Sequence, residues 1–418
     1  MVLLTLIFEA DYVKKPNPST SHRNNMSVSN SKNSTYGDKM EAHDVVSLVD
    51  DLFKRAVESD ASDVHFEPMS SELVIKFRLD GVLKTVEKVP KSLSDNVIAR
   101  LKVLGGLLTY RSDIPQEGRI ETDKIHNGRV TDQRLAVFPT IQGQRAVVRL
   151  FYKNTELMEL GQLGFSEDTY AALKAIAAQN QGVFLLTGPA GSGKSTTLAA
   201  LLRHILKRFP GKSIVTLEDP VEIRIADITQ TQITPHGEMT FPTALRSLLR
   251  QDPQVLMIGE IRDAETAKIV VEAGLTGHLL MSTMHSGTPA GALLRLLEMG
   301  IEPYQVTSSV SAVLNQRLIR RLCAKCKKKS HSAGAEFEAA GCDDCFNTGF
   351  KGRVLITEMV HLDGQLRKAI LAKADLDQLE DILKNKGHTN MLEDGRRLVS
   401  EGVTTHEELD KVCGISTS

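Results

Sequence analysis

Residues 188–195 read Gly-Pro-Ala-Gly-Ser-Gly-Lys-Ser, a complete G-x-x-x-x-G-K-S phosphate loop, and they constrain the fold more than any other segment. The apolar run 183–186 before the loop is typical of a buried strand, and apolar residues recur at helical spacing over 198–206. A strand, a glycine-rich turn and a helix therefore follow one another, which is the context that such a loop requires. The motif predicts a nucleotide-binding chain; the alternative is a chance glycine-rich turn.

The phosphate loop also predicts which atoms contact the nucleotide. In loops of this kind the backbone N–H groups converge on the phosphates, the lysine reaches the β and γ oxygens, and the hydroxyl binds magnesium. We therefore expect Lys194 to contact the phosphates and Ser195 to hold Mg²⁺. The complete set of residues expected to bind the nucleotide here is Gly188, Pro189, Ala190, Gly191, Ser192, Gly193, Lys194, Ser195 and Thr196.

The composition excludes some classes of protein. The formal net charge is -1 and there is no Trp, so the chain has neither the basic excess nor the aromatic supply typical of a nucleic-acid binder. No direct nucleic-acid partner is expected. No apolar stretch approaches the roughly 18 residues that span a bilayer. Residues 1–10 are apolar but have no basic leader, so we expect no signal peptide and a soluble, cytoplasmic protein.

Changes of pattern along the 418 residues predict two or three domains. A helical stripe begins near Asp44, alternating apolar residues precede the Asp80-Gly81 turn, and Asn127-Gly128 marks another hairpin. The expected parts are a flexible polar tail over 1–43, an α+β domain over 44–152, a linker over 153–163, an α/β domain with the phosphate loop over 164–322, a cysteine-containing insert over 323–353 and a helical region over 354–418.

The α/β domain is predicted to contain a parallel sheet. Short apolar runs at 183–186, 214–217, 255–258 and 279–281 alternate with helical patterns. Strands that are apolar on both faces are typical of parallel sheets covered by helices. The phosphate loop then lies at the carboxyl end of its strand, where open α/β sheets bind their ligands.

Carboxylates follow two of these runs. The run 214–217 leads into an acidic segment containing Asp219 and Glu222, and the run 255–258 leads to Glu260. Because parallel strands end at one edge of a sheet, we expect these acids beside the phosphate loop, where phosphoryl transfer needs bound metal and an oriented water. The alternatives are a solvated acidic loop and a structural Glu260.

The same edge allows more specific expectations. Asp219 is expected to support magnesium together with Ser195, and Glu260 to polarise water. His285 follows the apolar run 279–284 and is expected to sense the nucleotide through hydrogen bonds. The alternative for His285 is a satisfied structural histidine.

Four cysteines form a second strong pattern. Cys323 and Cys326 are spaced as C-x₂-C, and Cys342 and Cys345 repeat that spacing. Four thiolates on two such turns are typical of a tetrahedral structural zinc site. The alternatives are unmetallated thiols or, with the neighbouring lysines, a zinc-dependent nucleic-acid binder. Cys413 has no partner motif and is expected to be a free thiol.

Several motifs occur together in one order: 61–67, 78–81, 115–119, 188–196, 216–222, 259–263, 276–285, 316–318 and the four cysteines. In this combination the chain resembles the secretion ATPase superfamily, and more narrowly the traffic ATPases of type II secretion and type IV pilus assembly. The resemblance covers about residues 44–415. It implies a RecA-like core that binds ATP, preceded by an α+β domain.

The resemblance also implies a mechanism and partners. ATP would lie between the two domains of a cytoplasmic homo-hexamer, peripheral to the inner membrane, which drives a platform protein there to extrude pilin or pseudopilin. Carried onto this chain, Glu222 orients water, Glu260 supports it and His285 couples the nucleotide to conformation. Arginines that would reach the γ-phosphate are Arg78, Arg134 and Arg149.

Two features differ from the family's pattern and bear on the alternatives. The family carries a long N-terminal docking domain where about 43 mostly polar residues stand here, so recruitment to the membrane is expected to differ. Ser112-Asp113-Ile114 replaces a paired basic motif before Pro115, so no arginine finger is expected there. Pilus retraction motors, the alternative together with DNA-uptake motors, share the ATP boxes and also lack the docking domain, so the short N-terminus fits them. They generally lack the four-cysteine insert, which favours assembly or secretion. A non-hydrolysing, nucleotide-gated scaffold is the remaining alternative.

Overall fold

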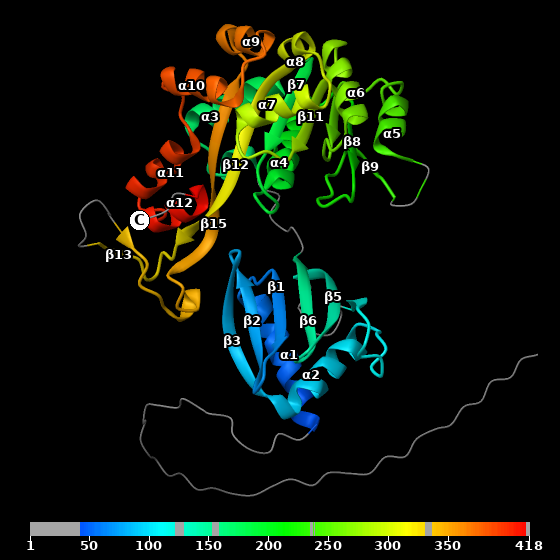
Figure 1. Cartoon of the computed structure of the whole chain (residues 1–418), viewed down its shortest axis with the longest axis vertical. Coiled ribbons are helices and arrows are strands. Elements are labelled where there is room, and N and C mark those ends of the chain that lie inside the picture. Colours follow the sequence, from blue (N-terminus) through cyan, green and yellow to red (C-terminus); the bar gives the residue numbers. More distant parts are fainter. Residues whose placement is uncertain are drawn as a thin grey trace, which may run out of the picture.

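The computed structural model describes residues 42–121, 129–152, 159–234, 237, 239–330 and 337–414. Within these ranges the chain forms a six-stranded sheet and a seven-stranded sheet, each with its own helices, stacked along the long axis of the molecule (Figure 1). The tail expected over 1–43, apart from Ala42 and His43 in the first helix, and the turn expected at Asn127-Gly128 lie outside the described residues. None of the described helices has the length and apolarity needed to cross a membrane.

The six-stranded sheet has the order β3-β2-β1-β6-β5-β4, and every neighbouring pair is antiparallel. The predicted alternation over 73–79 is confirmed, because Leu73, Ile75 and Phe77 on one face of β2 are fully buried. They share a core with α1 and α2. The elements are α1 (Ala42–Glu58), β1 (Asp63–Pro68), β2 (Glu72–Leu79), β3 (Val82–Pro90), α2 (Lys91–Leu104), β4 (Gln116–Ile120), β5 (Val130–Thr140) and β6 (Gly143–Tyr152).

The seven-stranded sheet has the order β15-β12-β7-β11-β10-β8-β9. Its strands are parallel except for the antiparallel pair β12 and β15, so the predicted parallel sheet is confirmed with an antiparallel edge. The strands are β7 (Gly182–Thr187), β8 (Ile214–Glu218), β9 (Thr229–Gln232), β10 (Val255–Ile258), β11 (Leu279–Met284), β12 (Val310–Leu322) and β15 (Phe350–His361).

Helices cover both faces of this sheet. Along β7 the side chains alternate, since Val183 and Leu185 enter one core while Phe184 and Leu186 enter the other. Each fully buried side chain of this size contributes about 1.5–3 kcal/mol. The helices are α3 (Glu167–Ala177), α4 (Lys194–Arg208), α5 (Phe241–Leu248), α6 (Ala264–Leu275), α7 (Pro289–Glu298), α8 (Pro303–Ser309), α9 (Gly364–Leu371), α10 (Leu376–Asn385), α11 (Met391–Ser400) and α12 (His406–Cys413), with a short 3₁₀ turn at Leu160–Gln162.

One expectation was wrong in part. Residues 354–418 were expected to be helical, but 354–361 belong to β15, which pairs antiparallel with β12 along most of its length. The physical reason is that β12 runs for 13 residues and needs a partner for its outer edge. The run Val354-Leu355-Ile356 supplies that partner, and helices α9–α12 follow it.

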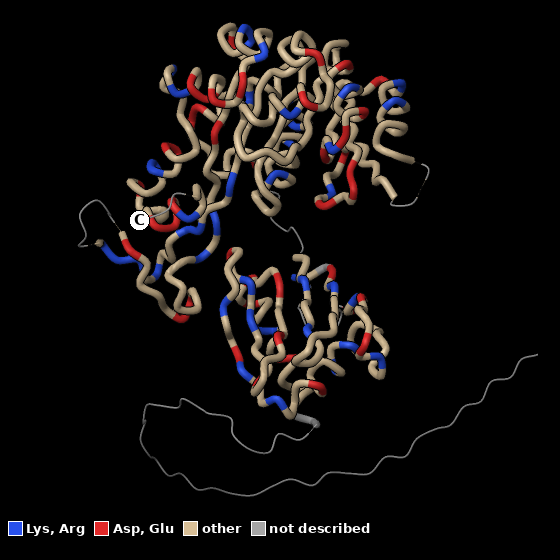
Figure 2. Tube along the Cα trace, viewed as in Figure 1, with Lys and Arg blue, Asp and Glu red and all other residues tan. Residues whose placement is uncertain are grey.

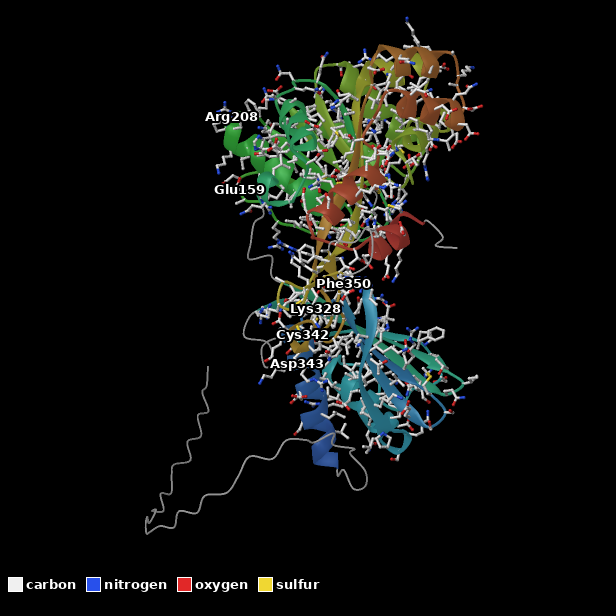
Figure 3. All side chains as sticks on the ribbon, turned by 90° about the vertical axis from the view of Figure 1, so that its left-hand side faces the viewer. Glu159, Arg208, Lys328, Cys342, Asp343 and Phe350 are labelled. Carbon is white, nitrogen blue, oxygen red and sulfur yellow. The ribbon has the colours of Figure 1, made fainter. Side chains whose placement is uncertain are left out.

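The four-cysteine segment connects β12 to β15 and lies against the six-stranded sheet. It contains β13 (Lys328–Lys329), β14 (Phe337–Glu338) and a 3₁₀ turn at Asp343–Cys345. In the view turned by 90°, Lys328, Cys342, Asp343 and Phe350 lie together between the two sheets (Figure 3). Phe346 packs against the core of the six-stranded sheet, so this segment forms a contact between the two halves of the molecule.

Candidate functional site

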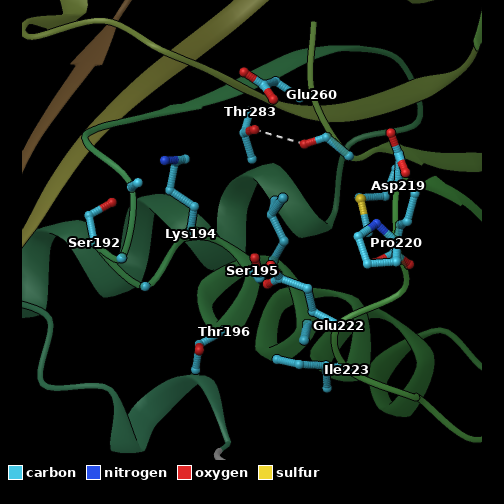
Figure 4. Close-up of a pocket in the computed structure, with 18 of the residues that line it drawn as sticks. Ser192, Lys194, Ser195, Thr196, Asp219, Pro220, Glu222, Ile223, Glu260 and Thr283 are labelled. Carbon is cyan, nitrogen blue, oxygen red and sulfur yellow. Dashed lines mark hydrogen bonds between the residues drawn. The ribbon is translucent and has the colours of Figure 1, made fainter. Parts of the chain in front are cut away.

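One cavity of about 500 Å³ lies at the carboxyl ends of the parallel strands. Its wall contains the phosphate loop, the acidic segment after β8, the end of β10 and the end of β11 (Figure 4). The predicted residues that line it are Ala190, Gly191, Ser192, Gly193, Lys194, Ser195, Thr196, Asp219, Glu222, Glu260 and His285. The structure therefore brings together residues from four separate segments of the sequence.

Backbone geometry explains the glycines of the phosphate loop. Gly188 has a φ of +138°, and a Cβ at this position would lie 2.3 Å from the carbonyl oxygen of Gln316. Gly193 has a φ of +88° and lies directly before α4. An L side chain is strained at both positions, so the loop can pass close to β12 only with glycine there.

Gln316 on β12 fixes the loop from behind. Its amide nitrogen donates to the carbonyl oxygen of Ser192 at 2.7 Å, and its amide oxygen accepts from the hydroxyl of Thr197 at 3.0 Å. The Gln316 side chain is fully buried, so both bonds are shielded from water. The Ser192 hydroxyl is buried without a hydrogen-bond partner, which leaves one polar group in the loop available to a ligand.

Lys194 begins α4 and folds back onto the loop. Its ammonium donates to the carbonyl oxygens of Gly188 at 2.8 Å and Pro189 at 2.9 Å. Gly188 and Pro189 thus position the Lys194 ammonium, although they do not line the cavity themselves. Burial lowers the pKa of Lys194, and the negative charges of Glu260 and Glu222 act in the opposite direction. Anionic phosphate oxygens would stabilise this partly desolvated ammonium.

Glu260 is held from two sides. Its Oε1 lies 3.1 Å from Nε2 of His285, and its Oε2 accepts from Nε of Arg262 at 2.7 Å. The Glu260 side chain is 17% exposed, whereas that of His285 is 53% exposed. The carboxylate is therefore oriented at the cavity wall by a histidine from the end of β11 and by an arginine two residues along the chain.

The acidic segment divides into a buried and an exposed part. Glu218 is buried and accepts from the Thr216 hydroxyl at 2.7 Å and from Nε2 of Gln230 at 3.1 Å. Asp219 and Glu222 are exposed at the cavity wall. Asp219 and the Ser195 hydroxyl line the same cavity and offer oxygen donors of the kind that Mg²⁺ prefers, so these two residues fit a magnesium site.

The three arginines predicted to reach phosphate lie elsewhere in this chain. Arg78, Arg134 and Arg149 stand on strands of the six-stranded sheet and are not among the residues that line the cavity. Arg78 and Arg149 pair with Asp63 at 3.3 and 3.0 Å, and Arg134 pairs with Asp132 at 3.4 Å. Their action on the nucleotide of a neighbouring subunit stays a prediction.

Sequence reasoning missed two arginines of the cavity. Arg262 lies inside the box 259–263, where its position next to Glu260 was the available indication. Arg353 comes from β15, beyond the cysteines, and nothing local in the sequence places it near the phosphate loop.

The four predicted cysteines form one cluster. Their sulfur atoms all lie within 4.8 Å of one another, with Cys323 and Cys342 3.9 Å apart and Cys326 and Cys345 3.8 Å apart. The N–H groups of Cys342 and Gly349 both donate to Sγ of Cys345 at 3.3 Å. Burial raises the pKa of that thiol, but these hydrogen bonds outweigh it and lower the pKa to about 7. The cluster fits a tetrahedral zinc ion.

Comparisons with known proteins show which family the chain belongs to. The model of the family "Type II/IV secretion system protein" matches residues 38–411. The chain is 39% identical over 379 residues to the type IV pilus assembly ATPase PilB of Thermus thermophilus, covering 87% of this chain and 42% of that protein. It is 39% identical over 392 residues to the type II secretion system protein E of Pseudomonas aeruginosa, covering 90% of this chain and 77% of that protein.

Solved structures show a similar fold. The ATPase DotB of Legionella pneumophila superimposes with a TM-score of 0.64 at 19% identity, covering 88% of this chain and 96% of that one. The pilus retraction motor PilT with bound ADP superimposes with a TM-score of 0.56 at 22% identity, covering 88% and 97%. The family model spans most of the chain, and the sequence identities lie well above those of shared fold alone. The chain therefore belongs to the type II/IV secretion system protein family, together with type II secretion system protein E and the type IV pilus assembly ATPases.

Proposed function

We propose that this chain is an ATPase motor that hydrolyses ATP to ADP and phosphate and so powers the assembly of pilin or pseudopilin in a type II secretion or type IV pilus machine. One observation carries the proposal. A phosphate loop, exposed acids and an oriented glutamate from separate strands line a single cavity of about 500 Å³. The relatives are named as proteins of type IV pilus assembly and type II secretion, which supports a role in such a machine.

Each residue of the cavity has its own role in ATP hydrolysis. The phosphate loop and Lys194 bind and position the phosphates, and Ser195 with Asp219 would hold magnesium, which neutralises the charge that develops during phosphoryl transfer. Glu222 orients the attacking water. Glu260 polarises that water, and His285 reports the state of the γ-phosphate through its contact with Glu260.

Both oxygens of Glu260 are occupied, by His285 and by Arg262. Each carboxylate oxygen keeps a second lone-pair site, so Glu260 can accept a hydrogen bond from water while both partners stay in place. The side chains of His285 and Arg262 are 53% and 64% exposed, so both contacts are open to exchange with water or nucleotide. A nucleotide-dependent change in the contact between His285 and Glu260 would link water activation to a displacement at the end of β11.

The finer architecture follows from the same assignment. The seven-stranded sheet is a RecA-like core, the six-stranded sheet with α1 and α2 is a separate N-terminal domain, and the four cysteines hold zinc between β12 and β15. Six copies form a ring in the cytoplasm, where Arg78, Arg134 or Arg149 of one subunit reaches the nucleotide of the next. The ring acts on a platform protein in the inner membrane.

Steady-state phosphate release with and without magnesium tests the hydrolysis. Lys194→Ala is expected to lose about 100-fold or more of the activity, and Glu260→Gln to keep nucleotide binding while losing turnover. Lys207→Ala at the exposed end of α4 is the matched control and should retain the activity. Unchanged hydrolysis in both cavity variants would refute the assignment.

A retraction or DNA-uptake motor is the second candidate, because the fold is also similar to that of PilT. The four-cysteine segment favours assembly or secretion. A deletion strain decides between them, since an assembly motor predicts loss of fibres and a retraction motor predicts an excess. A nucleotide-gated scaffold would bind ATP without magnesium-dependent phosphate release.

A further inference from the structure

Arg353 lines the nucleotide cavity but belongs to a different part of the chain from every predicted site residue. It stands near the start of β15, three residues after Phe350, and reaches the cavity beside Leu318 and the phosphate loop. The Leu318 side chain lies 3.8 Å from the point where a Cβ on Gly193 would be. Arg353 therefore brings a positive charge to the loop from the outer edge of the sheet.

The only ionic contact that the structure gives Arg353, within the described residues, is weak and comes from the other sheet. Its Nε lies 3.9 Å from Oδ1 of Asp80, which occupies the turn between β2 and β3. The side chain of Arg353 is 42% exposed and that of Asp80 is 25% exposed. An ion pair of this length that is partly exposed to water contributes little stability. Arg353 can therefore exchange Asp80 for a better acceptor at little cost.

The position of Asp80 is nevertheless fixed. Its Oδ2 accepts from the backbone N–H of Gly352 at 2.8 Å, which ties the β2–β3 turn to β15. Phe346 packs against the core of the six-stranded sheet close by, and Asp80 and Phe346 line one small cavity at this junction. The carboxylate is thus held next to Arg353 by a contact that does not depend on the guanidinium.

Lys and Arg gather along this end of the β12–β15 pair (Figure 2). Most of the neighbouring cations are already paired: Arg320 with Glu408 at 2.5 Å, and Lys351 with Asp344 at 2.9 Å. Arg353 differs from them in having a long contact on one side and the cavity on the other. A planar guanidinium in that position suits the oxygens of a nucleotide's phosphates.

We propose that Arg353 binds the phosphates of the nucleotide in cis and that Asp80 competes for it, so that nucleotide loading weakens the contact between the β2–β3 turn and β15. This inference rests on the proposed function, because it needs ATP in the cavity. Since coupling between two contacts is reciprocal, removing the Asp80 charge must strengthen nucleotide binding. An ordinary structural ion pair predicts no such gain.

The test is a double-mutant cycle on the full chain, with a non-hydrolysable ATP analogue and magnesium as the probe. Arg353→Ala is expected to raise the Kd about ten-fold, as the loss of a charge-assisted hydrogen bond does, and Arg353→Gln is a second variant of similar length. Asp80→Asn keeps an acceptor for the Gly352 N–H but removes the charge. It is expected to lower the Kd by about two- to five-fold.

The cycle closes with the double variant. In the Arg353→Ala background, Asp80→Asn is expected to have no further effect on the Kd. Asp60→Asn is the matched control, because Asp60 also has a positive φ and pairs with an arginine, Arg129, at 2.6 Å, but lies outside the cavity. Thermal unfolding of each variant confirms that it is folded.

Two results would overturn the inference: an Asp80→Asn variant that binds the analogue no more tightly than the wild type, or a gain that persists without Arg353. Failure of the proposed function is distinguishable. In that case the wild type itself does not bind the analogue, or Lys194→Ala binds as well as the wild type. Binding that depends on Lys194 but ignores both Asp80 and Arg353 leaves the ATPase assignment intact and refutes only the competition.

Discussion

At the scale of single residues, the cavity depends on polar side chains that neighbouring residues hold in place. Gln316 spans from β12 to the phosphate loop and to the first turn of α4, with both ends of its amide paired. Glu260 is oriented in the same way by two neighbours. Gln316 thus fixes a loop whose glycines allow many backbone conformations, and the two partners of Glu260 fix the orientation of its carboxylate.

Gln316→Ala is expected to weaken nucleotide binding without unfolding the chain. The substitution leaves the Ser192 carbonyl and the Thr197 hydroxyl without their shared partner, which costs about 1–3 kcal/mol and raises the Kd for ATP about ten-fold. Titration of the variant with ATP measures this Kd. Gln254→Ala, a substitution at an exposed position outside the cavity, should bind as the wild type does. Equal affinities in both variants would contradict the role given to Gln316.

At the scale of elements, adjacent strands hold a buried charge. Asp63 begins β1 and lies opposite Arg78 on β2 and Arg149 on β6. Its side chain is 7% exposed. Burial alone would raise the pKa of Asp63, but hydrogen bonds from Ser62 and Arg149 and the charges of both arginines outweigh it and lower the pKa below the ordinary 3.8. The ionised carboxylate therefore stabilises the centre of the six-stranded sheet.

Asp63→Asn is expected to destabilise the chain by about 1–2 kcal/mol at pH 7, a value reduced because both arginines are partly exposed. Because the folded pKa is lowered, this contribution is fully present above the unfolded pKa of about 3.9 and is lost as pH falls through the folded value. Urea unfolding at pH 7 and near pH 3 should show that the difference in the free energy of unfolding between wild type and variant becomes smaller in acid. The same difference in free energy at both pH values, or an equal effect of Asp60→Asn, would contradict the stabilising role of the ionised Asp63.

The four-cysteine segment is a second element, and we predict that its stability depends on one bound zinc ion. We expect about one zinc ion per chain, because four thiolates complete one tetrahedral site. Chelation under reducing conditions should raise amide hydrogen exchange between Cys323 and Phe350, since such sites contribute folding energy. Cys326→Ser should lose the metal, whereas Cys413→Ser on α12 should keep it. Absence of metal in the reduced wild type would contradict the assignment.

Local patterns predicted the elements that depend on local sequence. The phosphate loop at 188–195, the strand over 73–79 and the four cysteines each carry their spacing within a short segment. The pairing of β12 with β15 was missed because it joins residues about forty positions apart, across the cysteines. Arg353 was missed for the same reason, since only that pairing brings it to the cavity.

At the scale of the whole molecule, two sheets meet through the four-cysteine segment. Phe346 packs against the six-stranded sheet, and Asp80 of that sheet accepts from Gly352 on β15. Arg353, the next residue on the same strand, lines the nucleotide cavity. Under the proposed competition for Arg353, nucleotide loading weakens this contact between the two halves, which is how differential affinity could become motion.

The most direct test of the central claim is magnesium-dependent phosphate release, measured as a function of protein concentration together with the mass of the oligomer. A ring motor predicts activity per subunit that rises as hexamers form and vanishes in Glu260→Gln. A chain that binds ATP as a monomer and releases no phosphate at any concentration or oligomer mass would contradict it.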